Sequence, residues 1–384
     1  MPSRRDVLAT IGAGVAAGTA GCSGRNCTPA APVGADWPQP GGDPGNTAAL
    51  PDRSLPARVG ERWRAPIVPD DDVLAFAGSV LDADRIGSAD RAPETGFYAE
   101  TRLRDGEAGT RTPVPERIAS PPVSVNGRTA IAYATDDGAE LRLFDDGSDS
   151  GRYSLRNAPA TPRAAGTTLF GGDAGGAFAY DVTSDEQRWR RAFGDEREGG
   201  AVSFSPAVDD RRVYVAVTSS SDRGIYALNR RDGGVEWSVE GPRAVRGPVR
   251  TGSLLLVPAA YELLAFDAET GARRWSTQTP ADRRAFRPPA GAGERLVVSD
   301  GEALHALDPE SGGLGWSVEF GRVGRPFVVG DALFVAADDG IVALELADGS
   351  ERWRLDGVSP VAPLGNGVLV YSDGELIACT DCEN

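Results

Sequence analysis

A short unit recurs along the C-terminal two thirds of the sequence and constrains the fold more than any other feature. In its clearest copy, an apolar run that starts at Leu263 ends in Asp267, a turn containing Gly271 follows, and Trp275 stands eight positions after the acid. The same offset links Asp181 to Trp189, Asn229 to Trp237, Asp308 to Trp316 and Glu345 to Trp353, and, with Tyr in place of Trp, Asp145 to Tyr153. One structural motif is therefore expected to be used many times.

Each part of the unit suits a β-hairpin. Asp at the start of a turn accepts hydrogen bonds from the turn's own N–H groups, and Gly271 can adopt the positive φ that a short bulged hairpin requires. Where Gly is missing, Asp185 stands at the matching place and tolerates the left-handed region. A small residue two positions before the turn acid would let neighbouring sheets approach closely. This position is occupied by Ala179, Ala227, Ala265, Ala306, Ala343 and Ala378.

Two further strand-like runs precede each hairpin, for example at 248–249 and 254–257. Four strands per unit, repeated every 40–50 residues or so, are typical of β-propeller blades, and successive Trp from Trp189 onward are 48, 38, 41 and 37 residues apart. One four-stranded sheet cannot bury both faces alone, so we expect each Trp to fill the space between two blades. The predicted blade-docking residues are Trp63, Trp189, Trp237, Trp275, Trp316 and Trp353.

The sequence predicts an all-β, eight-bladed β-propeller, with seven blades as the alternative. The run around Trp63 resembles a fourth strand without its first three, and the run from Pro360 to Cys379 resembles a unit that stops before its Trp. Pairing the two would close the ring and remove exposed sheet edges. The polar stretch 82–95 is expected to be a surface loop. The other units lie near 66–117, 118–158, 160–193, 202–240, 244–279, 285–320 and 323–356.

The charge balance argues against one class of partner. The chain has 56 acidic and 40 basic residues, none of the latter Lys, and a formal net charge of −16. An acidic surface repels phosphates, so nucleic acid is not expected as a partner. Acidity without Lys fits a protein that stays soluble at high salt, and a halophilic archaeon is the expected source; a field that attracts a cation or substrate is the alternative.

The first 22 residues are interpreted as an export signal. Arg4 and Arg5 precede a mildly apolar run, which is the twin-arginine pattern, and the run is too short to span a membrane. Small residues before Cys22 are similar to a lipobox, in which the Cys is lipidated after cleavage, although Thr19 replaces the usual Leu. We expect the protein to be anchored by a lipid on Cys22 to the outer face of the cytoplasmic membrane, with plain secretion or a retained anchor as alternatives.

Residues 23–36 are predicted to be a flexible tether, and residues 37–384 the propeller. The leader from Trp37 through Asp43 to Asn46 and Thr47, together with the units between Asp145 and Trp353, resembles the PQQ-like, quinoprotein-type repeat. This repeat forms eight-bladed propellers in the alcohol dehydrogenase quinoproteins and in the lipoprotein of the bacterial outer-membrane β-barrel assembly machine. The resemblance therefore implies the fold, and it leaves the function open.

Three cysteines remain if Cys22 is lipidated. Cys379 and Cys382 form a Cys-Thr-Asp-Cys sequence at the final turn, and oxidation to a disulfide is expected in an exported protein. Ring closure would also bring the C-terminus near the N-terminal strand, so a disulfide from Cys27 to either of the two stays open. An odd count leaves one Cys without a partner, and a zinc site lacks sufficient ligands.

No established catalytic motif was found in the sequence. His305 lies in an apolar strand and is interpreted as structural, and the run from Asp145 to Asp149 lacks the full ligand series of a calcium loop. Patterns for a nucleophile elbow, a zinc protease or a phosphate-binding loop do not occur. We therefore expect no catalytic or metal-ligating residues.

Two functions follow from the repeat and its resemblance. The first is a non-catalytic, monomeric scaffold that binds an unidentified protein partner. The second is a PQQ-dependent dehydrogenase, which by family resemblance would require an adjacent-cysteine disulfide, calcium ligands and an Asp base; no two cysteines are adjacent here. PQQ and calcium are therefore not expected as cofactors. Binding of a small ligand or sugar in the central channel is a further alternative.

Overall fold

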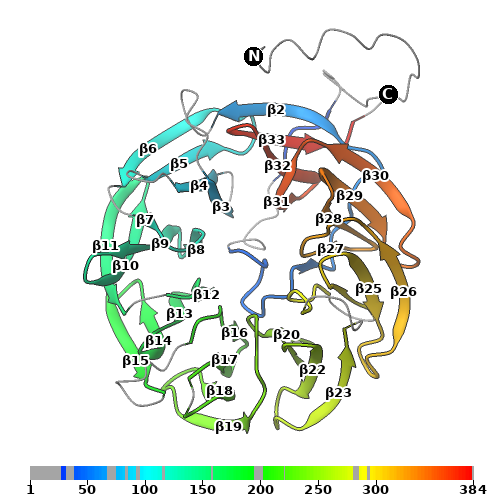
Figure 1. The fold of residues 1–384 in the computed structure, drawn as a ribbon. Helices are drawn as coiled ribbons and strands as arrows, with labels where there is room; N and C mark the ends of the chain where they lie inside the picture. The colour runs from blue at the N-terminus through cyan, green and yellow to red at the C-terminus, as the bar shows by residue number, and fades with distance from the viewer. Residues whose placement is uncertain are drawn as a thin grey trace, which may run out of the picture.

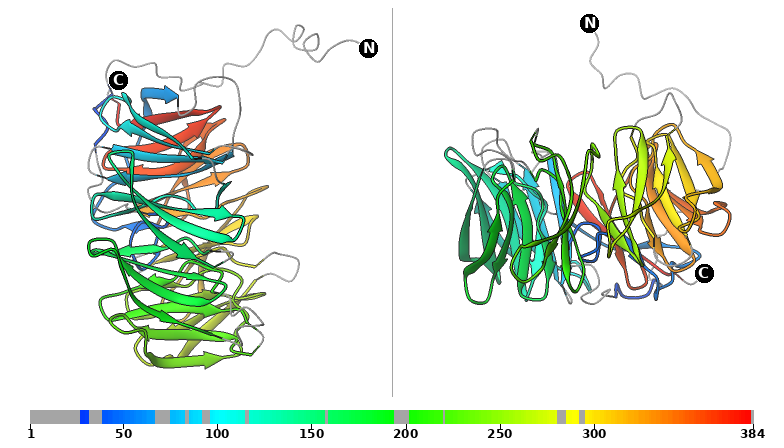
Figure 2. Two further views of the ribbon diagram at one scale, coloured as in Figure 1. Left: turned by 90° about the vertical axis from the view of Figure 1, so that its left-hand side faces the viewer. Right: turned by 90° about the horizontal axis from the view of Figure 1, so that it is seen from below.

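Eight sheets stand side by side around a common axis and form a closed ring (Figures 1 and 2). This computed structural model describes residues 27–31, 39–66, 75–82, 85–91, 96–114, 117–156, 159–193, 202–219, 221–279, 285–291 and 295–382. The eight-bladed propeller predicted from the repeats is confirmed, and the seven-bladed alternative is wrong. In the described part of the chain, no helix is long and apolar enough to cross a membrane.

The blades are numbered here in chain order, and their strands run from the ring axis outward. Blade 1 has β3 (Ala75–Asp82), β4 (Arg85–Arg91), β5 (Gly96–Arg102) and β6 (Ala108–Val114). Blade 2 has β7 (Arg117–Ile118), β8 (Val123–Val125), β9 (Arg128–Thr135), β10 (Gly138–Asp145) and β11 (Ser148–Leu155). Blade 3 has β12 (Arg163–Ala165), β13 (Thr168–Asp173), β14 (Gly176–Asp181) and β15 (Glu186–Arg191), and blade 4 has β16 (Ala207–Val208), β17 (Arg212–Val217), β18 (Gly224–Asn229) and β19 (Val235–Glu240). Blade 5 has β20 (Val249–Thr251), β21 (Leu254–Pro258), β22 (Glu262–Asp267) and β23 (Arg273–Gln278); blade 6 has β24 (Leu296–Ser299), β25 (Ala303–Leu307) and β26 (Leu314–Glu319); blade 7 has β27 (Phe327–Val329), β28 (Ala332–Ala337), β29 (Gly340–Glu345) and β30 (Glu351–Asp356); blade 8 has β31 (Ser359–Leu364), β32 (Gly367–Ser372) and β33 (Glu375–Thr380).

The two ends of the propeller close the ring as predicted. β2 (Gly60–Pro66) pairs antiparallel with β33 and supplies the fourth strand of blade 8, with Trp63 opposite Ala378. A second N-terminal strand, β1 (Ala49–Leu50), joins blade 7 as a parallel neighbour of β27. The ring is thus held by pairing between segments about three hundred residues apart in sequence, which leaves blade 8 dependent on both ends of the chain.

The hairpin between β22 and β23 has the geometry expected from its sequence. The Asp267 carboxylate accepts hydrogen bonds from the backbone N–H groups of Glu269 and Thr270 at 3.1 and 2.9 Å. Gly271 adopts φ of +73°, and the register shifts by a bulge next to Ala265, which lies opposite Trp275. Asp185 adopts φ of +59° in the copy that lacks Gly. The turn chemistry read from the sequence is therefore confirmed.

Each Trp of the repeat docks on the next blade through the same contact. The indole N–H donates to a backbone carbonyl in the following blade, at distances between 2.7 and 3.2 Å. The turn glycine approaches the indole so closely that a Cβ on Gly271 would lie 2.7 Å from the Trp237 ring. The donor and acceptor pairs are Trp63 to Leu103, Trp189 to Arg230, Trp237 to Ala268, Trp275 to Pro309, Trp316 to Leu346 and Trp353 to Pro56.

One sequence expectation in blade 1 is wrong, and the hairpin of blade 2 differs from the other copies of the unit. The stretch predicted as a surface loop contains β4, which pairs with both β3 and β5. In blade 2, Asp146 and Gly147 form a two-residue turn with positive φ at both positions, so Tyr153 lies opposite Leu141 rather than beside the bulge. Equal spacing in sequence therefore does not give equal register, because the turn is two residues shorter. Tyr153 still stacks on Tyr180 of blade 3, with ring centroids 4.7 Å apart.

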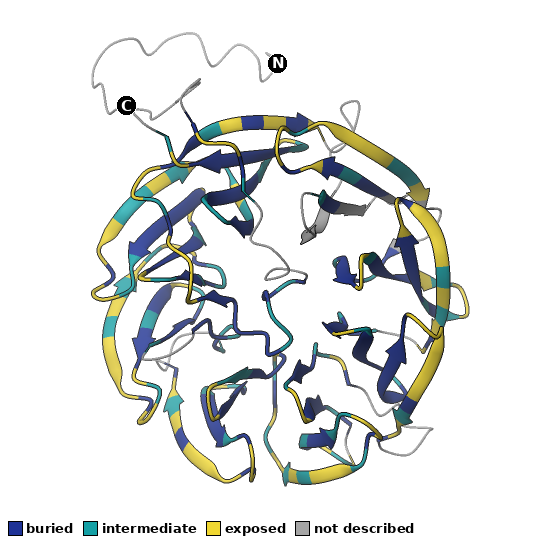
Figure 3. Ribbon diagram, turned by 180° about the vertical axis from the view of Figure 1, so that it is seen from behind, coloured by how far each residue is buried: buried dark blue, intermediate teal, exposed yellow. Residues whose placement is uncertain are grey.

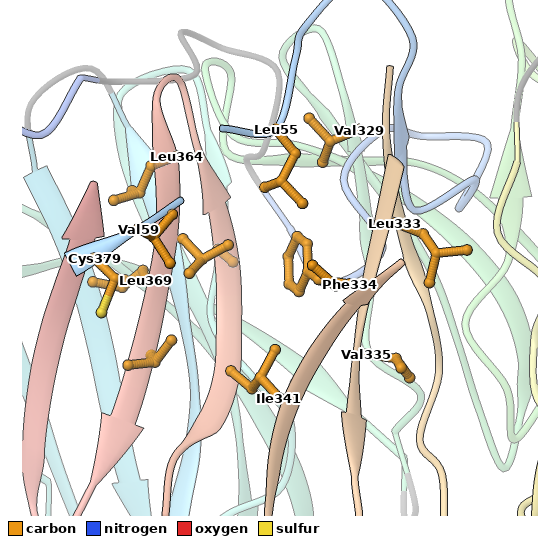
Figure 4. Close-up of a cluster of buried hydrophobic side chains, with 14 of the residues drawn as sticks. Leu55, Val59, Val329, Leu333, Phe334, Val335, Ile341, Leu364, Leu369 and Cys379 are labelled. Atoms are coloured by element: carbon orange, nitrogen blue, oxygen red, sulfur yellow. The ribbon is translucent and has the colours of Figure 1, made fainter. Parts of the chain in front are cut away.

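The core lies between blades, where inner strands of one sheet face those of the next. Figure 4 shows Phe334 and Ile341 of blade 7 facing Leu364 and Leu369 of blade 8, and all four side chains are buried. The outermost strands instead alternate between exposed and partly buried residues, as in β19 and β30, and Figure 3 shows this as bands at the rim. This pattern follows from the ring, because an outer strand packs on its neighbours yet borders solvent.

Candidate functional site

The N-terminal segment 39–50 crosses the centre of the ring (Figure 1, blue). Gln39 begins this path by pairing its side-chain amide with the backbone of Ala164 on β12. Carbonyl groups of the segment then accept hydrogen bonds from successive blades: Pro44 from Val208, Gly45 from Arg250, Thr47 from Gly291, and Ala48 from Val328. The segment is hereafter called the axial segment, and it connects the inner edges of blades 3 to 7.

Two arginines from distant blades converge on one residue of the axial segment. Arg163 of blade 3 donates to the side-chain oxygen of Asn46 at 2.6 Å, and Arg325 donates to the same oxygen at 2.9 Å. Arg163 also donates to the carbonyl of Pro40, and Arg325 to those of Asn46 and Pro289. Asn46 adopts φ of 65° and donates to the Pro248 carbonyl at 3.2 Å. A neutral amide oxygen thus receives two positively charged donors.

The environment disfavours the charge on these arginines. Arg163 is 3% exposed, and burial, followed by the neighbouring positive charge of Arg325, lowers the pKa of Arg163 to about 9. Burial also lowers the pKa of Arg325 to about 10. Asp43 contributes a favourable charge at longer range, but both its carboxylate oxygens accept hydrogen bonds from Thr47. At neutral pH both arginines stay protonated, although their charges are poorly balanced.

A chamber of about 340 Å³ opens beside these arginines. Its polar lining comes from Asn46, Thr161, Arg163, Ser203, Ser205 and Arg325. The remaining walls are formed by Phe204, Ala160, Gly247 and prolines at 40, 159 and 288. Among the described residues that line it there is no Asp or Glu, although acidic residues outnumber basic ones in the whole chain. This axial chamber is therefore a positively charged hollow in an acidic protein.

We predict that Gly41→Ala disturbs the axial segment and lowers the free energy of unfolding by about 1–3 kcal/mol. Gly41 has φ of +86°, and a Cβ there would lie 2.2 Å from the Asn46 side-chain oxygen and 2.9 Å from Arg325. Urea unfolding followed by circular dichroism measures the change. Gly127→Ala is the matched control, because φ is +75° there but nothing lies within 4 Å of the added Cβ among the described residues. Equal losses in the two variants would contradict the proposed packing.

The geometry at His305 fits the structural role expected for it. Its Nε2 lies 3.0 Å from the Asp300 carboxylate and its Nδ1 lies 3.1 Å from the Ser317 hydroxyl. Burial alone would raise the pKa of Asp300, but hydrogen bonds from His305 and from two backbone N–H groups lower it overall. Because both ring nitrogens contact side chains of the same blade, the imidazole links neighbouring parts of blade 6.

The described residues do not match the cofactor site that the quinoprotein resemblance implies. They contain no group of three or more His, Cys, Asp or Glu side chains arranged to hold a metal ion. The chain has no adjacent cysteines, and the chamber lining described above offers no carboxylate to act as a base. The Asp145–Asp149 run forms the two-residue turn of blade 2. We therefore derive no reaction step through PQQ or calcium.

Of the pairings left open by the sequence, the structure has the disulfide between Cys27 and Cys382. It joins residues 355 positions apart, and Thr28 reinforces it through a backbone hydrogen bond to the Asp381 carbonyl at 2.9 Å. Cys379 remains a buried thiol. Burial raises the pKa of Cys379 to about 12, so this thiol stays protonated at neutral pH. The expected Cys379–Cys382 bond is not formed.

Other predicted site residues lie outside the described part of the chain. They are Arg4 and Arg5 of the export signal and the lipidation residue Cys22; Trp37 of the leader also lies outside the described residues. The sequence reading in turn missed the axial arginines, Arg163 and Arg325. The Asn-Thr pair of the leader was visible in the sequence, yet nothing in its spacing indicated contacts with residues 117 and 279 positions away.

Comparison with known proteins identifies the family. The family model described as outer membrane protein assembly factor BamB matches residues 173–290 and 262–381, from blade 3 to the end of blade 8. A curated polyvinylalcohol dehydrogenase from a Pseudomonas species is 32% identical over 100 residues, which cover 24% of this chain. That match spans 15% of the length of the enzyme, so it concerns a small part of a longer protein.

Solved structures with the same fold have different functions. BamB from Moraxella catarrhalis has a TM-score of 0.58 at 16% identity, covering 74% of this chain and 97% of its own. The quinohemoprotein alcohol dehydrogenase from Comamonas testosteroni has a TM-score of 0.67 at 14% identity, with coverages of 90% and 80%. The computationally designed protein Ika8 has a TM-score of 0.63 at 11% identity, with coverages of 82% and 96%.

An assembly factor, an enzyme and a designed protein therefore share this architecture, so the fold alone carries no function. Family membership rests on different evidence: the family model matches more than half of the chain, and the matched residues include the repeat that forms the blades. The protein belongs to the BamB-type family of PQQ-like repeat β-propellers.

Proposed function

We propose that this protein is a non-catalytic scaffold that binds a partner protein in an assembly outside the cytoplasm. The composition of the axial chamber carries the proposal: its described lining provides guanidinium and hydroxyl groups but no carboxylate. A dehydrogenase of the quinoprotein type would instead need an Asp base and calcium ligands that are acidic as well as amide groups. The family description, an outer membrane protein assembly factor, supports the same choice.

The fold suits a scaffold because the ring is rigid and offers two faces of turns. The inter-blade Trp contacts and the β2–β33 closure fix the blades relative to one another, which lowers the conformational entropy that would be lost on binding. The rim strands expose charged side chains that keep such a platform soluble at high salt. We propose that the propeller acts as a monomer.

The proposed location follows from the N-terminal sequence. Arg4 and Arg5 would direct export of the folded protein, and a lipid on Cys22 would retain it at the outer face of the cytoplasmic membrane. The chain between Cys22 and the axial segment would then serve as the link between membrane and ring. A propeller anchored in this way would bind its partner at or near the membrane surface.

Capture from native membranes tests the scaffold. The full chain with a C-terminal tag is expressed in its own host, cross-linked in intact cells, and isolated after membrane extraction. We expect one partner to be recovered reproducibly in near-stoichiometric amount with wild-type protein, and in much lower amount with the Cys22→Ser variant, which lacks the proposed anchor. Recovery of the propeller alone from cross-linked membranes would contradict the proposal.

An activity measurement tests the competing dehydrogenase. Purified full-length protein is mixed with PQQ and calcium chloride, and reduction of an artificial electron-accepting dye by a primary alcohol or by polyvinyl alcohol is recorded. We expect no dye reduction above the same mixture without protein. Saturable PQQ binding together with alcohol-dependent dye reduction would contradict the scaffold proposal and show that the protein is a dehydrogenase.

A further inference from the structure

The axial chamber has more hydrogen-bond donors than the protein satisfies. Arg163 and Arg325 each present five N–H groups in a planar fork, and their terminal nitrogens donate to the axial segment and to Pro289. The Nε of each is buried, and among the described residues none accepts a hydrogen bond from it. Buried donors without an acceptor are costly, and more so when they carry charge. The chamber therefore favours a molecule that accepts hydrogen bonds.

The unbalanced positive charge of the two arginines also favours a molecule that accepts hydrogen bonds, in this case an anion. Two guanidinium groups meet at the neutral side-chain oxygen of Asn46, a place where a carboxylate would pair with both. The carboxylate of Asp43 is satisfied by Thr47. The chain has a net charge of −16, yet this chamber has two arginines and no acidic residue among its described lining residues. A bound anion would supply the missing negative charge.

The remaining wall groups suit a small oxyanion. Thr161, Ser203 and Ser205 contribute hydroxyl groups that can donate to oxygen atoms. Phe204 and the three prolines contribute apolar groups to the walls of the chamber. Its volume of about 340 Å³ corresponds to roughly ten waters at the ~30 Å³ that each occupies in the liquid. The space admits a small organic anion and is too narrow for a folded chain.

We propose that the axial chamber binds a small molecule that carries a phosphate or carboxylate group, held between the guanidinium groups of Arg163 and Arg325 and oriented by the hydroxyls of blades 3 and 4. Such a molecule would also hold the axial segment in place, because the same arginines anchor Asn46 and Pro40. The position of the axial segment at the centre of the ring would thus depend on whether the ligand is bound. This inference does not depend on the proposed scaffold function.

Isothermal titration calorimetry on the full-length protein tests the site with two probes, inorganic phosphate and succinate, at constant ionic strength maintained by sodium chloride. We expect saturable one-to-one binding of at least one probe. Phosphate alone would indicate a phosphorylated ligand, and succinate alone a carboxylate ligand. Absence of saturable heat with both probes would overturn the proposal, whatever the capture experiment for the scaffold shows.

Three variants locate the binding. Arg163→Gln should weaken it by about tenfold or more, because it removes a charged donor pair. Asn46→Asp should weaken it comparably, because the new carboxylate supplies the anion's charge in place and Asp tolerates positive φ; the variant also loses the hydrogen bond to the Pro248 carbonyl, so affinity rather than stability is its readout. Arg230→Gln is the control: this arginine also donates to backbone carbonyls, of Asp209 and Ala165, but does not line the chamber.

The folding of each variant is checked by circular dichroism before titration. If Arg163→Gln does not fold, Thr161→Val replaces it as the test, because it removes a hydroxyl from the lining without removing an anchor of Asn46. Unchanged affinity in the folded chamber variants, or an equal loss in Arg230→Gln, would place the anion elsewhere and overturn the proposal.

Discussion

The Trp275→Ala variant is expected to lose about 3–5 kcal/mol of unfolding free energy. Trp275 is buried between blades 5 and 6, and its indole N–H donates to the Pro309 carbonyl at 2.8 Å. Burial of one Trp removes ~150–250 Å² from water, which at ~25 cal/mol per Å² is an upper bound of roughly 4–6 kcal/mol. The facing turn glycine, Gly312, leaves no side chain that could fill the cavity.

Equilibrium unfolding in urea, followed by far-ultraviolet circular dichroism, measures this loss without relying on Trp fluorescence. Trp275→Phe keeps an aromatic ring but removes the N–H donor, so we expect a smaller loss of about 1–2 kcal/mol. Tyr261→Ala is the surface control, since Tyr261 is 77% exposed and its replacement should change stability by no more than about 0.5 kcal/mol. A Trp275→Ala protein as stable as wild type would remove this side chain from the inter-blade core.

Loss of the Cys27–Cys382 disulfide is expected to have the second largest effect, about 2–5 kcal/mol. The bond joins residues 355 positions apart, so it restricts the unfolded chain over almost the whole propeller. In the chain-entropy view this restriction grows with loop length, although slowly. The bond also keeps residues 27–31 on blade 8, where Asn366 donates to the Pro29 carbonyl at 2.9 Å.

The double variant Cys27→Ser, Cys382→Ser is compared with wild type with and without dithiothreitol, by urea unfolding. Reductant should shift the wild-type curve to that of the double variant and leave the double variant unchanged. Peptide mapping under non-reducing conditions should recover the Cys27 and Cys382 peptides together. Recovery of a Cys379–Cys382 peptide instead, or a wild-type curve insensitive to reductant, would be inconsistent with the disulfide found here.

Most of the fold could be predicted because the blade unit is local in sequence. Asp267, Gly271 and Trp275 lie within nine residues, and the interactions that shape the hairpin act over the same distance. Because the unit is repeated, a count of seven or eight blades and the closure of the ring by the strand that contains Trp63 could also be predicted. The polar stretch in blade 1 misled the prediction, because its composition hides a strand, β4, that pairs with neighbours on both sides and buries Ile86. Tyr153 keeps the spacing of eight, but its register differs from that of the Trp residues because the turn of blade 2 has only two residues, which the spacing does not reveal.

The all-β class, the propeller architecture, the turn chemistry and the Trp that join adjacent blades could be predicted from the sequence, since each depends on residues close in the chain, whereas the choice of eight blades over seven needed the structure. The pairing of the cysteines and the meeting of side chains at the axis became evident from the three-dimensional structure alone. Asn46 contacts Arg163 and Arg325, which belong to opposite parts of the ring and carry no shared motif. Their meeting follows from the path of the axial segment across five blades, and backbone carbonyls that any sequence could provide hold most of that path.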